Sequence, residues 1–338
     1  MTKKTKIFTF RIFLFVVFFK VLFFNTITSF AEESFSSWLT SYKKFALSKG
    51  VSKKTLDLVL SDVRFLNQVI KYDRKQPEFF EDTNTYVSKR ASLSRSNKAK
   101  NLYQKNKDLF NEVEKTFFVE KEILLALWGI ETNFGKHVGK MDIISSLATL
   151  SYDKRRRDFF SSELLILLKL IDDKLLDHTT LFGSWAGAFG NFQFMPSTIK
   201  NYAIDYDGNN KIELKTSLED SLASAANYIR KIGWKKNEPC FYKVKTTKEI
   251  KNKYINTSAR KINNRLKVSK WKKKGIIIEN INMSNQNLKA ALVMPDGKPD
   301  TPTFLVFQNY EKILKWNRSL RFGISVCTLA NMINNEIK

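Results

Sequence analysis

The segment VEKEILLALWGIETNFG (119–135) constrains the fold more than any other part of the chain. Its apolar residues recur at helical spacing, and Leu124, Leu127 and Trp128 stand seven, four and three positions before Glu131. Residues at these separations share one face of a helix. The sequence therefore predicts a buried helix that carries a carboxyl group on its apolar face.

Glu131 is expected in the last turn of this helix, because Gly135 follows closely and suits the left-handed residue after a helix C-terminus. The negative end of the helix dipole and the apolar face both disfavour an ionised carboxyl, so both should raise the pKa of Glu131. A carboxyl that keeps its proton near neutral pH can act as a general acid. The alternative is a side chain that turns toward water or pairs with a nearby arginine.

The remaining pattern indicates a mainly helical α+β protein. Helical periodicity covers 35–115, 119–133 and SSELLILLKLIDDKLLD (161–177), and it returns in the C-terminal tail. The stretch GSWAGAFG (183–190) has three glycines in eight residues, which is costly inside a helix and suggests backbone that approaches a ligand. Ser217 is expected to cap a helix that ends near Ile232. Later, the short segments FYKVKTTKEI, GIIIENINM and TFLVF predict a small sheet.

The N-terminus predicts export. Residues 1–31 combine a basic start, an apolar run and small residues at Ser29 and Ala31, as in a secretory signal peptide. The alternative is an uncleaved membrane anchor, which Lys20 disfavours because it interrupts the apolar run. No cysteine stands directly after the signal, so a lipoprotein is not expected and the predicted location is the periplasm.

The net charge of +25 is concentrated between Lys243 and Lys274, where 13 Lys or Arg face the single acid Glu249. Nucleic acid is not the expected partner, because the anionic polymers outside the cytoplasm belong to the cell wall and the membrane surface. The sequence assigns this basic stretch no role. Cys240 and Cys327 could form a disulfide or remain two separate buried thiols.

Two common chemistries lack their residues. The chain has only His137 and His178, neither with a Cys or His partner at metal-ligand spacing, so a zinc site is not expected. Ser184 lies between Gly183 and Gly187, which is not the G-x-S-x-G pattern of serine hydrolases.

Five ordered blocks carry a family resemblance. They are WGIETNFG, LATLSYDKRRRDFF, GSWAGAFGNFQFMPSTIKNYAIDYDGN, LASAANYI and LKWNRS. In this order and spacing they resemble the lytic murein transglycosylase B family, most closely over 124–234. The resemblance implies a lysozyme-like fold and cleavage of the MurNAc–GlcNAc bond of peptidoglycan without water. It also implies that Glu131 is the single catalytic acid, first protonating the leaving oxygen and then accepting a proton from the sugar's own 6-hydroxyl. The product would be a 1,6-anhydro sugar, whereas ordinary glycosidases need two carboxylates.

The resemblance also implies substrate-binding residues. The expected set is Ser184, Gln193, Phe194, Met195, Tyr228 and Asn317, with Arg155 and Arg156 for substrate carboxylates. Three consecutive arginines, 155–157, leave the choice of the pair open. The alternatives are that Phe194, Met195 and Tyr228 only pack in the core and that the arginines form a solvated turn. Trp185, Asn191, Phe192 and Trp316 depart from the family pattern and are expected to alter the groove without abolishing it.

The predicted organisation has five parts and few partners. A signal peptide (1–31) precedes a helical N-terminal platform (32–115), a lysozyme-like catalytic core (116–240), a small β insertion (241–310) and a C-terminal helical part of the core (311–338). The expected partner is the peptidoglycan glycan strand, with proteins of cell-wall synthesis or division as unidentified candidates. The protein is expected to be a monomer that needs no cofactor for catalysis. A hydrolytic muramidase and a non-catalytic peptidoglycan-binding scaffold are the alternatives.

The segment DYDGNNKIELKTSLE (205–219) resembles the family's long variant of the EF-hand loop. The expected calcium ligands are Asp205, Asp207, Asn209, the Lys211 carbonyl and Glu219, because calcium prefers six to eight oxygens. Asn210 stands where such loops usually have glycine. The predicted role of calcium is structural, and the alternative is a polar turn with Glu219 near the start of the next helix.

Overall fold

The computed structural model describes residues 33–75, 80–279, 282–298 and 300–338. The predicted signal peptide therefore lies outside the described residues. Contacts divide the chain into a unit of residues 1–42 and a unit of residues 43–338, and helix α2 (Phe35–Ser48) crosses this division. All the features discussed below lie in the second unit. Among the described helices, none is long and apolar enough to cross a membrane.

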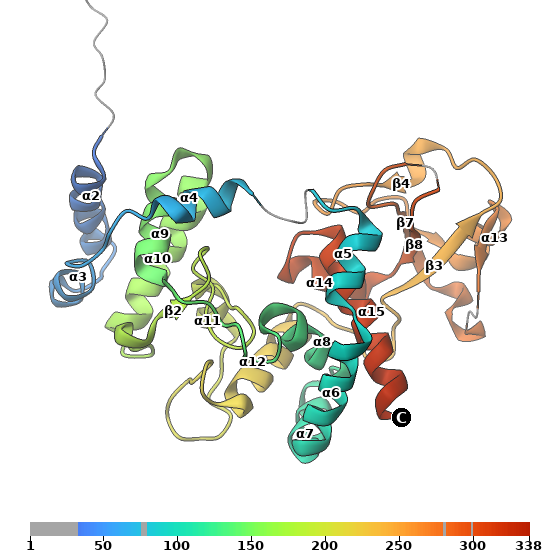
Figure 1. Cartoon of the computed structure of the whole chain (residues 1–338), viewed down its shortest axis with the longest axis horizontal. Helices are drawn as coiled ribbons and strands as arrows, with labels where there is room; N and C mark the ends of the chain where they lie inside the picture. Colours follow the sequence, from blue (N-terminus) through green and yellow to red (C-terminus); the bar gives the residue numbers. More distant parts are fainter. Residues whose placement is uncertain (1–32, 76–79, 280–281, 299) are drawn as a thin grey trace, which may run out of the picture. The chain divides into compact units, whose positions relative to one another are not determined.

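Most of the second unit is helical (Figure 1), as the sequence predicts. The helices after α2 are α3 (Lys53–Val59), α4 (Asn67–Arg74), α5 (Thr83–Arg90), α6 (Leu93–Lys105), α7 (Lys107–Phe117), α8 (Lys121–Thr132), α9 (Ile143–Tyr152), α10 (Arg157–Asp172), α11 (Pro196–Tyr202), α12 (Leu218–Lys231), α13 (Val268–Lys273), α14 (Gln308–Trp316) and α15 (Leu320–Ile337). The predicted helix at 119–133 is α8, and its residues from Ile123 to Leu127 are all buried. Helix α15 packs against α5, α6 and α8, so the C-terminal helix closes the core around α8.

Side-chain caps explain where several helices begin. Ser217 caps α12 as predicted, since its hydroxyl accepts a hydrogen bond from the Asp220 N–H at 3.1 Å. Asp142 caps α9 by accepting from the N–H groups of Ile144 and Ser145. Pro196 occupies the first turn of α11, where its missing N–H costs nothing.

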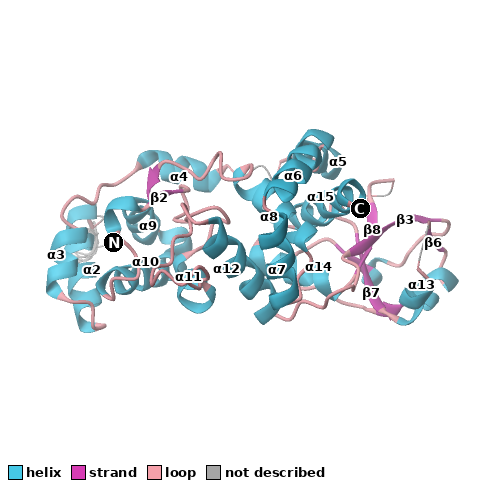
Figure 2. Ribbon diagram, turned by 90° about the horizontal axis from the view of Figure 1, so that it is seen from below, coloured by secondary structure: helices cyan, strands magenta, loops and turns pink. Residues whose placement is uncertain are grey.

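Within the described residues, the strands form a two-stranded sheet and a six-stranded sheet. Strands β1 (Met141–Asp142) and β2 (Phe182–Gly183) make the first. The larger sheet has the order β4-β7-β8-β3-β6, with β5 also paired to β7, and Figure 2 shows β7, β8 and β3 together. Its strands are β3 (Phe241–Thr246), β4 (Ile255–Asn256), β5 (Leu266–Lys267), β6 (Ile276–Ile278), β7 (Lys289–Val293) and β8 (Thr303–Val306). Among these strand pairs, only β4–β7 is parallel.

The larger sheet has its own apolar core. Val244 of β3 is buried between the exposed Lys243 and Lys245, which is the alternation expected of a strand with one covered face. On the covered side, Trp271 of α13 is fully buried and donates from Nε1 to the Ala290 carbonyl at 2.8 Å. The sequence predicts strands at β3, β6 and β8. It does not predict β7, which lies between β4 and β8.

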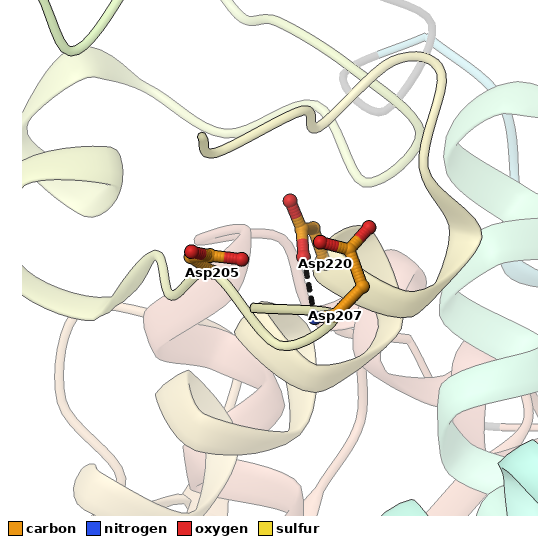
Figure 3. Close-up of side chains that lie close together, drawn as sticks. All are labelled: Asp205, Asp207 and Asp220. Carbon is orange, nitrogen blue, oxygen red and sulfur yellow. Dashed lines mark hydrogen bonds between the residues drawn. The ribbon is translucent and has the colours of Figure 1, made fainter. Parts of the chain in front are cut away.

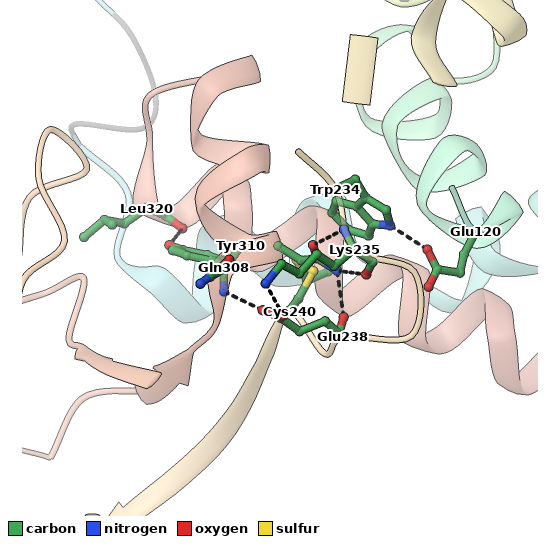
Figure 4. The surroundings of a disulfide bond; sticks show 10 residues. Glu120, Trp234, Lys235, Glu238, Cys240, Gln308, Tyr310 and Leu320 are labelled. Carbon is green, nitrogen blue, oxygen red and sulfur yellow. Dashed lines mark hydrogen bonds and ion pairs between the residues drawn. A yellow bond between two sulfur atoms is a disulfide. The ribbon is translucent and has the colours of Figure 1, made fainter. Parts of the chain in front are cut away.

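The β region is the segment 241–310, the predicted β insertion. A disulfide joins Cys240, directly before this region, to Cys327 of α15 (Figure 4). The two Cα atoms are 6.0 Å apart, and 87 positions separate the cysteines in the sequence. Hydrogen bonds hold the segments next to the disulfide in place. Phe307 N donates to the Cys240 carbonyl, and Trp234 Nε1 donates to Glu120 Oε2. Of the two arrangements that the sequence leaves open, the structure has the disulfide and not two separate thiols.

Candidate active site

Glu131 lies in the last turn of α8, as predicted, but the helix ends differently. Asn133 is its left-handed cap (φ 52°), and Phe134 (φ 61°) and Gly135 (φ 77°) continue in the same region. Gly135 is left-handed as expected, but the left-handed residue that directly follows the helix is Asn133. Asparagine tolerates this conformation because its short polar side chain bonds locally. Three successive left-handed residues turn the chain sharply away directly after Glu131.

The Glu131 carboxyl is half-buried, and Trp316 is its partner. Trp316 Nε1 donates a hydrogen bond to Glu131 Oε1 at 2.9 Å, which connects α8 to the end of α14. The indole also packs against Phe194 and Tyr228, with ring centroids 5.4 Å and 5.2 Å away. The acid is thus held at an aromatic wall and does not turn freely into water.

The glycine-rich loop 183–195 lies against α9 and the loop before α12. A Cβ at Gly187 would come within 2.4 Å of the Leu147 side chain, and one at Gly190 within 2.4 Å of the Leu214 carbonyl. At both positions protein atoms fill the space that a side chain would need, so close packing inside the protein is enough to require glycine. Ser184 accepts a hydrogen bond at its hydroxyl from the Ala188 N–H at 2.9 Å, so it shapes the turn of this loop.

Asn191 fixes the loop to α8 and α12, a role that the sequence analysis misses. Its side-chain oxygen accepts from Trp128 Nε1 at 3.1 Å, and its amide donates to the Ser221 hydroxyl at 3.2 Å. Its carbonyl accepts from the Thr132 hydroxyl at 2.8 Å. Only its place inside the motif could have pointed to Asn191, because a buried amide leaves no periodic signal.

Gln193 has a left-handed backbone (φ 52°) and a side chain that makes two hydrogen bonds. Its amide nitrogen donates to the carbonyls of Val138 and Gly190 at 3.1 Å and 2.9 Å. The bond to Val138 ties the glycine-rich loop to the segment after α8. The Gln193 side chain is thereby held in a fixed position.

A groove of about 910 Å³ brings most of the predicted binding residues together. Of the expected set it is lined by Gln193, Phe194, Met195, Tyr228, Asn317 and Arg156. Ser184, Arg155 and Glu131 do not line it, although Trp316 does and holds Glu131 from the groove side. The β region contributes Thr257–Arg260 and Pro295 to the same groove. Sequence reasoning misses this contribution, because the spacing of these residues carries no motif.

Tyr228 joins the groove wall to α14. Its hydroxyl donates to the Lys315 carbonyl at 3.2 Å, and its ring lies 4.5 Å from that of Tyr202. Burial raises the pKa of Tyr228 to about 12. The phenol therefore stays neutral at physiological pH and can donate hydrogen bonds but cannot act as a base there.

The two predicted arginines meet a carboxylate of the protein itself. Arg155 Nε donates to Asp73 Oδ2 at 2.7 Å, and Arg156 pairs with Asp73 Oδ1. The third arginine, Arg157, donates instead to the Tyr152 carbonyl at 2.7 Å, so the pair that holds Asp73 is Arg155 and Arg156. Burial opposes ionisation of Asp73, but the hydrogen bonds and charges of both arginines lower its pKa below its ordinary value.

The predicted calcium loop gathers three carboxylates (Figure 3). One oxygen from each of Asp205, Asp207 and Asp220 lies within 4.8 Å of the others. Glu219 is exposed and lies outside this group, whereas Asp220 is fully buried and was not among the expected ligands. Asn210 has the left-handed conformation (φ 66°) that this position was expected to need. The Asn209 side-chain oxygen accepts from the Lys211 N–H at 2.9 Å.

A family model described as "Transglycosylase SLT domain" matches residues 34–331. The chain belongs to this family. It is 38% identical over 138 residues to the membrane-bound lytic murein transglycosylase B of Escherichia coli strain K12. That match covers 40% of this chain and 38% of the length of the E. coli protein.

Solved structures of lytic transglycosylases share the fold. SltB3 from Pseudomonas aeruginosa, in complex with NAG-NAM-pentapeptide, matches with a TM-score of 0.81 and 30% identity, covering 90% of this chain and 81% of that chain. Slt35 from E. coli, in complex with calcium, matches with a TM-score of 0.76 and 24% identity, covering 91% and 95%. At that identity the second likeness shows the fold alone. The predicted lysozyme-like, mainly helical fold is confirmed.

Proposed function

We propose that the protein is an exported lytic transglycosylase that cleaves the MurNAc–GlcNAc bond of peptidoglycan, with Glu131 as its single acid and base. The family and the resemblance to SltB3 support the substrate class. The observation that carries the mechanism is the distribution of acids. Among the described residues that line the groove, Glu163 is the only acid, and it is 4% exposed. Its carboxylate accepts from the N–H and hydroxyl of Ser197, so it serves as a cap for α11.

The chemistry then follows from one carboxyl group. Protonated Glu131 gives its proton to the glycosidic oxygen as that bond breaks. The resulting carboxylate accepts the proton of the muramic acid 6-hydroxyl while this oxygen bonds to C1. No water is consumed, so no second carboxylate is needed to activate one. Trp316 positions the acid through its hydrogen bond, and Gln193, Tyr228 and Asn317 hold the sugar in the groove.

Replacing Glu131 with glutamine tests the catalytic role directly. Glutamine has nearly the same shape but cannot transfer the proton, so the rate of peptidoglycan cleavage should fall by about two to four orders of magnitude. Thermal unfolding and glycan-strand binding should change little. Glu122→Gln, on the first turn of the same helix, is the matched control and should keep activity within a few-fold of the wild type. A Glu131→Gln enzyme that cleaves at a similar rate would assign the acid to another residue.

We also propose that the loop 205–220 binds calcium for structural stability. The support is its donor set, because Asp205, Asp207 and Asp220 offer the hard carboxylate oxygens that calcium prefers. Asn209 and the Lys211 carbonyl would complete the shell with water. Since Asp220 lies in the first turn of α12 while Asp205 follows α11, a bound cation would join two elements that flank the groove.

Calorimetric titration of chelator-stripped protein tests this site, together with melting curves. Calcium should release binding heat at millimolar concentration or below and raise the melting temperature, and Asp220→Asn should abolish both effects. Glu219→Gln should retain them if Asp220 is the ligand from this helix. No heat and no calcium-specific rise in the wild-type protein would leave only a polar turn.

A further inference from the structure

The β region concentrates positive charge more than the rest of the protein. Residues 243–274 hold 13 of the 58 Lys and Arg and one acid, a net charge of +12 within a total of +25. Eleven of these thirteen side chains are exposed, the half-buried exceptions being Arg265 and Lys274. Within the described residues, only Lys245 and Arg265 of the thirteen form ion pairs. Internal pairing therefore does not explain this charge.

Helix α13 shows how the charge is displayed. Val268 and Trp271 are fully buried, so they fix the helix on the sheet core, and its three lysines, Lys270, Lys272 and Lys273, are exposed. Lys274, which follows the helix, and Lys253 both lie over the Tyr254 ring, at 4.6 Å and 5.3 Å from its centroid. The segment that carries Lys253 thus adds its charge beside the lysines of α13.

One large apolar side chain is exposed on a segment that packs against α13. Met283, which begins a short 3-10 helix (Met283–Asn287), is 74% exposed. This short helix contacts α13. We call the set Lys253, Lys270, Lys272, Lys273, Lys274 and Met283 the α13 surface.

We propose that the α13 surface docks the protein on a lipid bilayer that contains anionic headgroups. Clustered lysines are attracted to the negative potential of such a membrane, and an exposed apolar side chain beside them gains by entering the boundary between headgroups and acyl chains. The carboxylates of peptidoglycan would satisfy the lysines but offer Met283 no apolar phase. The combination of both features favours the bilayer over an anionic polymer. This docking is independent of the residues that line the groove.

The test compares charge-reversal variants of the full chain. Lys270→Glu/Lys272→Glu/Lys273→Glu changes the α13 surface, and Lys105→Glu/Lys107→Glu/Lys115→Glu changes the charge equally at exposed sites on α6 and α7. Partitioning onto phosphatidylglycerol-containing vesicles should fall by at least about tenfold in the first variant and much less in the second. Met283→Ser should weaken binding without changing charge. Thermal unfolding and cleavage of soluble glycan strands establish that each variant is folded.

Hydrogen–deuterium exchange shows which segment contacts the vesicle, so it separates binding through the α13 surface from binding through residues 1–31. Phosphatidylglycerol vesicles should protect peptides from 268–288 in the wild-type protein, whereas phosphatidylcholine vesicles should not. If both triple variants lost vesicle binding equally, binding would depend on overall charge, and the proposal would be overturned. Absence of protection would also overturn it. If 268–288 is protected by purified peptidoglycan and not by vesicles, the partner is the anionic polymer instead of the bilayer.

Discussion

Asp73 is the residue on which the arginine pair depends. Its side chain is 1% exposed and its carboxylate pairs with Arg155, Arg156 and Arg74. Arg156 also lies 4.8 Å over the Phe160 ring and lines the groove. A guanidinium held on two sides keeps one orientation, so Asp73 fixes the orientation in which Arg156 lines the groove.

Replacing Asp73 with asparagine should therefore affect both stability and binding. We expect a loss of about 2 kcal/mol in the free energy of unfolding at pH 7, because charged hydrogen bonds to a buried group disappear. KM for peptidoglycan should rise with little change in kcat. Asp158→Asn, at an exposed site on α10, is the control and should change neither quantity measurably.

The difference in the free energy of unfolding between wild type and Asp73→Asn should change with pH in one direction. The folded-state pKa of Asp73 is lowered, so its contribution is present above the unfolded value of about 4 and is lost as pH falls through the folded value. Denaturant unfolding of wild type and Asp73→Asn should thus give a constant stability gap down to about pH 4, which narrows at lower pH. A gap that is unchanged at pH 3 would mean that the charge of Asp73 does not carry the effect.

At the scale of elements, the glycine-rich loop depends on close packing as much as on backbone freedom. Gly187 (φ 87°) faces Leu147 of α9 with no room for a Cβ, whereas Gly50 (φ 89°) has nothing within 4 Å of that position. The two glycines share a positive φ and differ in their surroundings. They therefore form a matched pair that separates the cost of backbone strain from the cost of a steric clash.

Alanine substitutions should reveal this difference in chemical unfolding. Gly50→Ala should lower the free energy of unfolding by about 1–2 kcal/mol from backbone strain alone. Gly187→Ala should cost about 1–3 kcal/mol more, because Leu147 must move. Its cleavage rate should also fall, since the loop carries Gln193. Equal costs for the two variants would show that α9 yields to the added methyl without strain.

Periodicity and caps make several elements predictable from sequence. Helix α8 follows from its apolar spacing, and α12 from Ser217 and Asp220 at its start. Strand β7 is harder to predict, because KAALV lacks alternation when both faces are covered. The roles of Asn191 and Trp316 depend on contacts across 63 and 185 positions, which no local pattern encodes.

At the scale of the whole molecule, distant segments assemble the site. Glu131 comes from α8 and Trp316 from α14, and the β region adds Thr257–Arg260 to the groove. The disulfide between Cys240 and Cys327 ties that region to α15, which packs on α8. Glu131, the proposed catalytic acid, is thus supported by elements from both sides of the β region in the sequence.

Mass spectrometry of the muropeptides released from purified peptidoglycan tests the central claim most directly. Among the described residues that line the groove, Glu163 is the only acid, and its hydrogen bonds to Ser197 leave it unsuited to activate water. We therefore expect products that end in 1,6-anhydromuramic acid, one water lighter than hydrolysis products and unlabelled when the reaction runs in heavy-oxygen water. Reducing ends that carry heavy oxygen would contradict it and identify a muramidase. An absence of any product from folded protein would leave a peptidoglycan-binding scaffold.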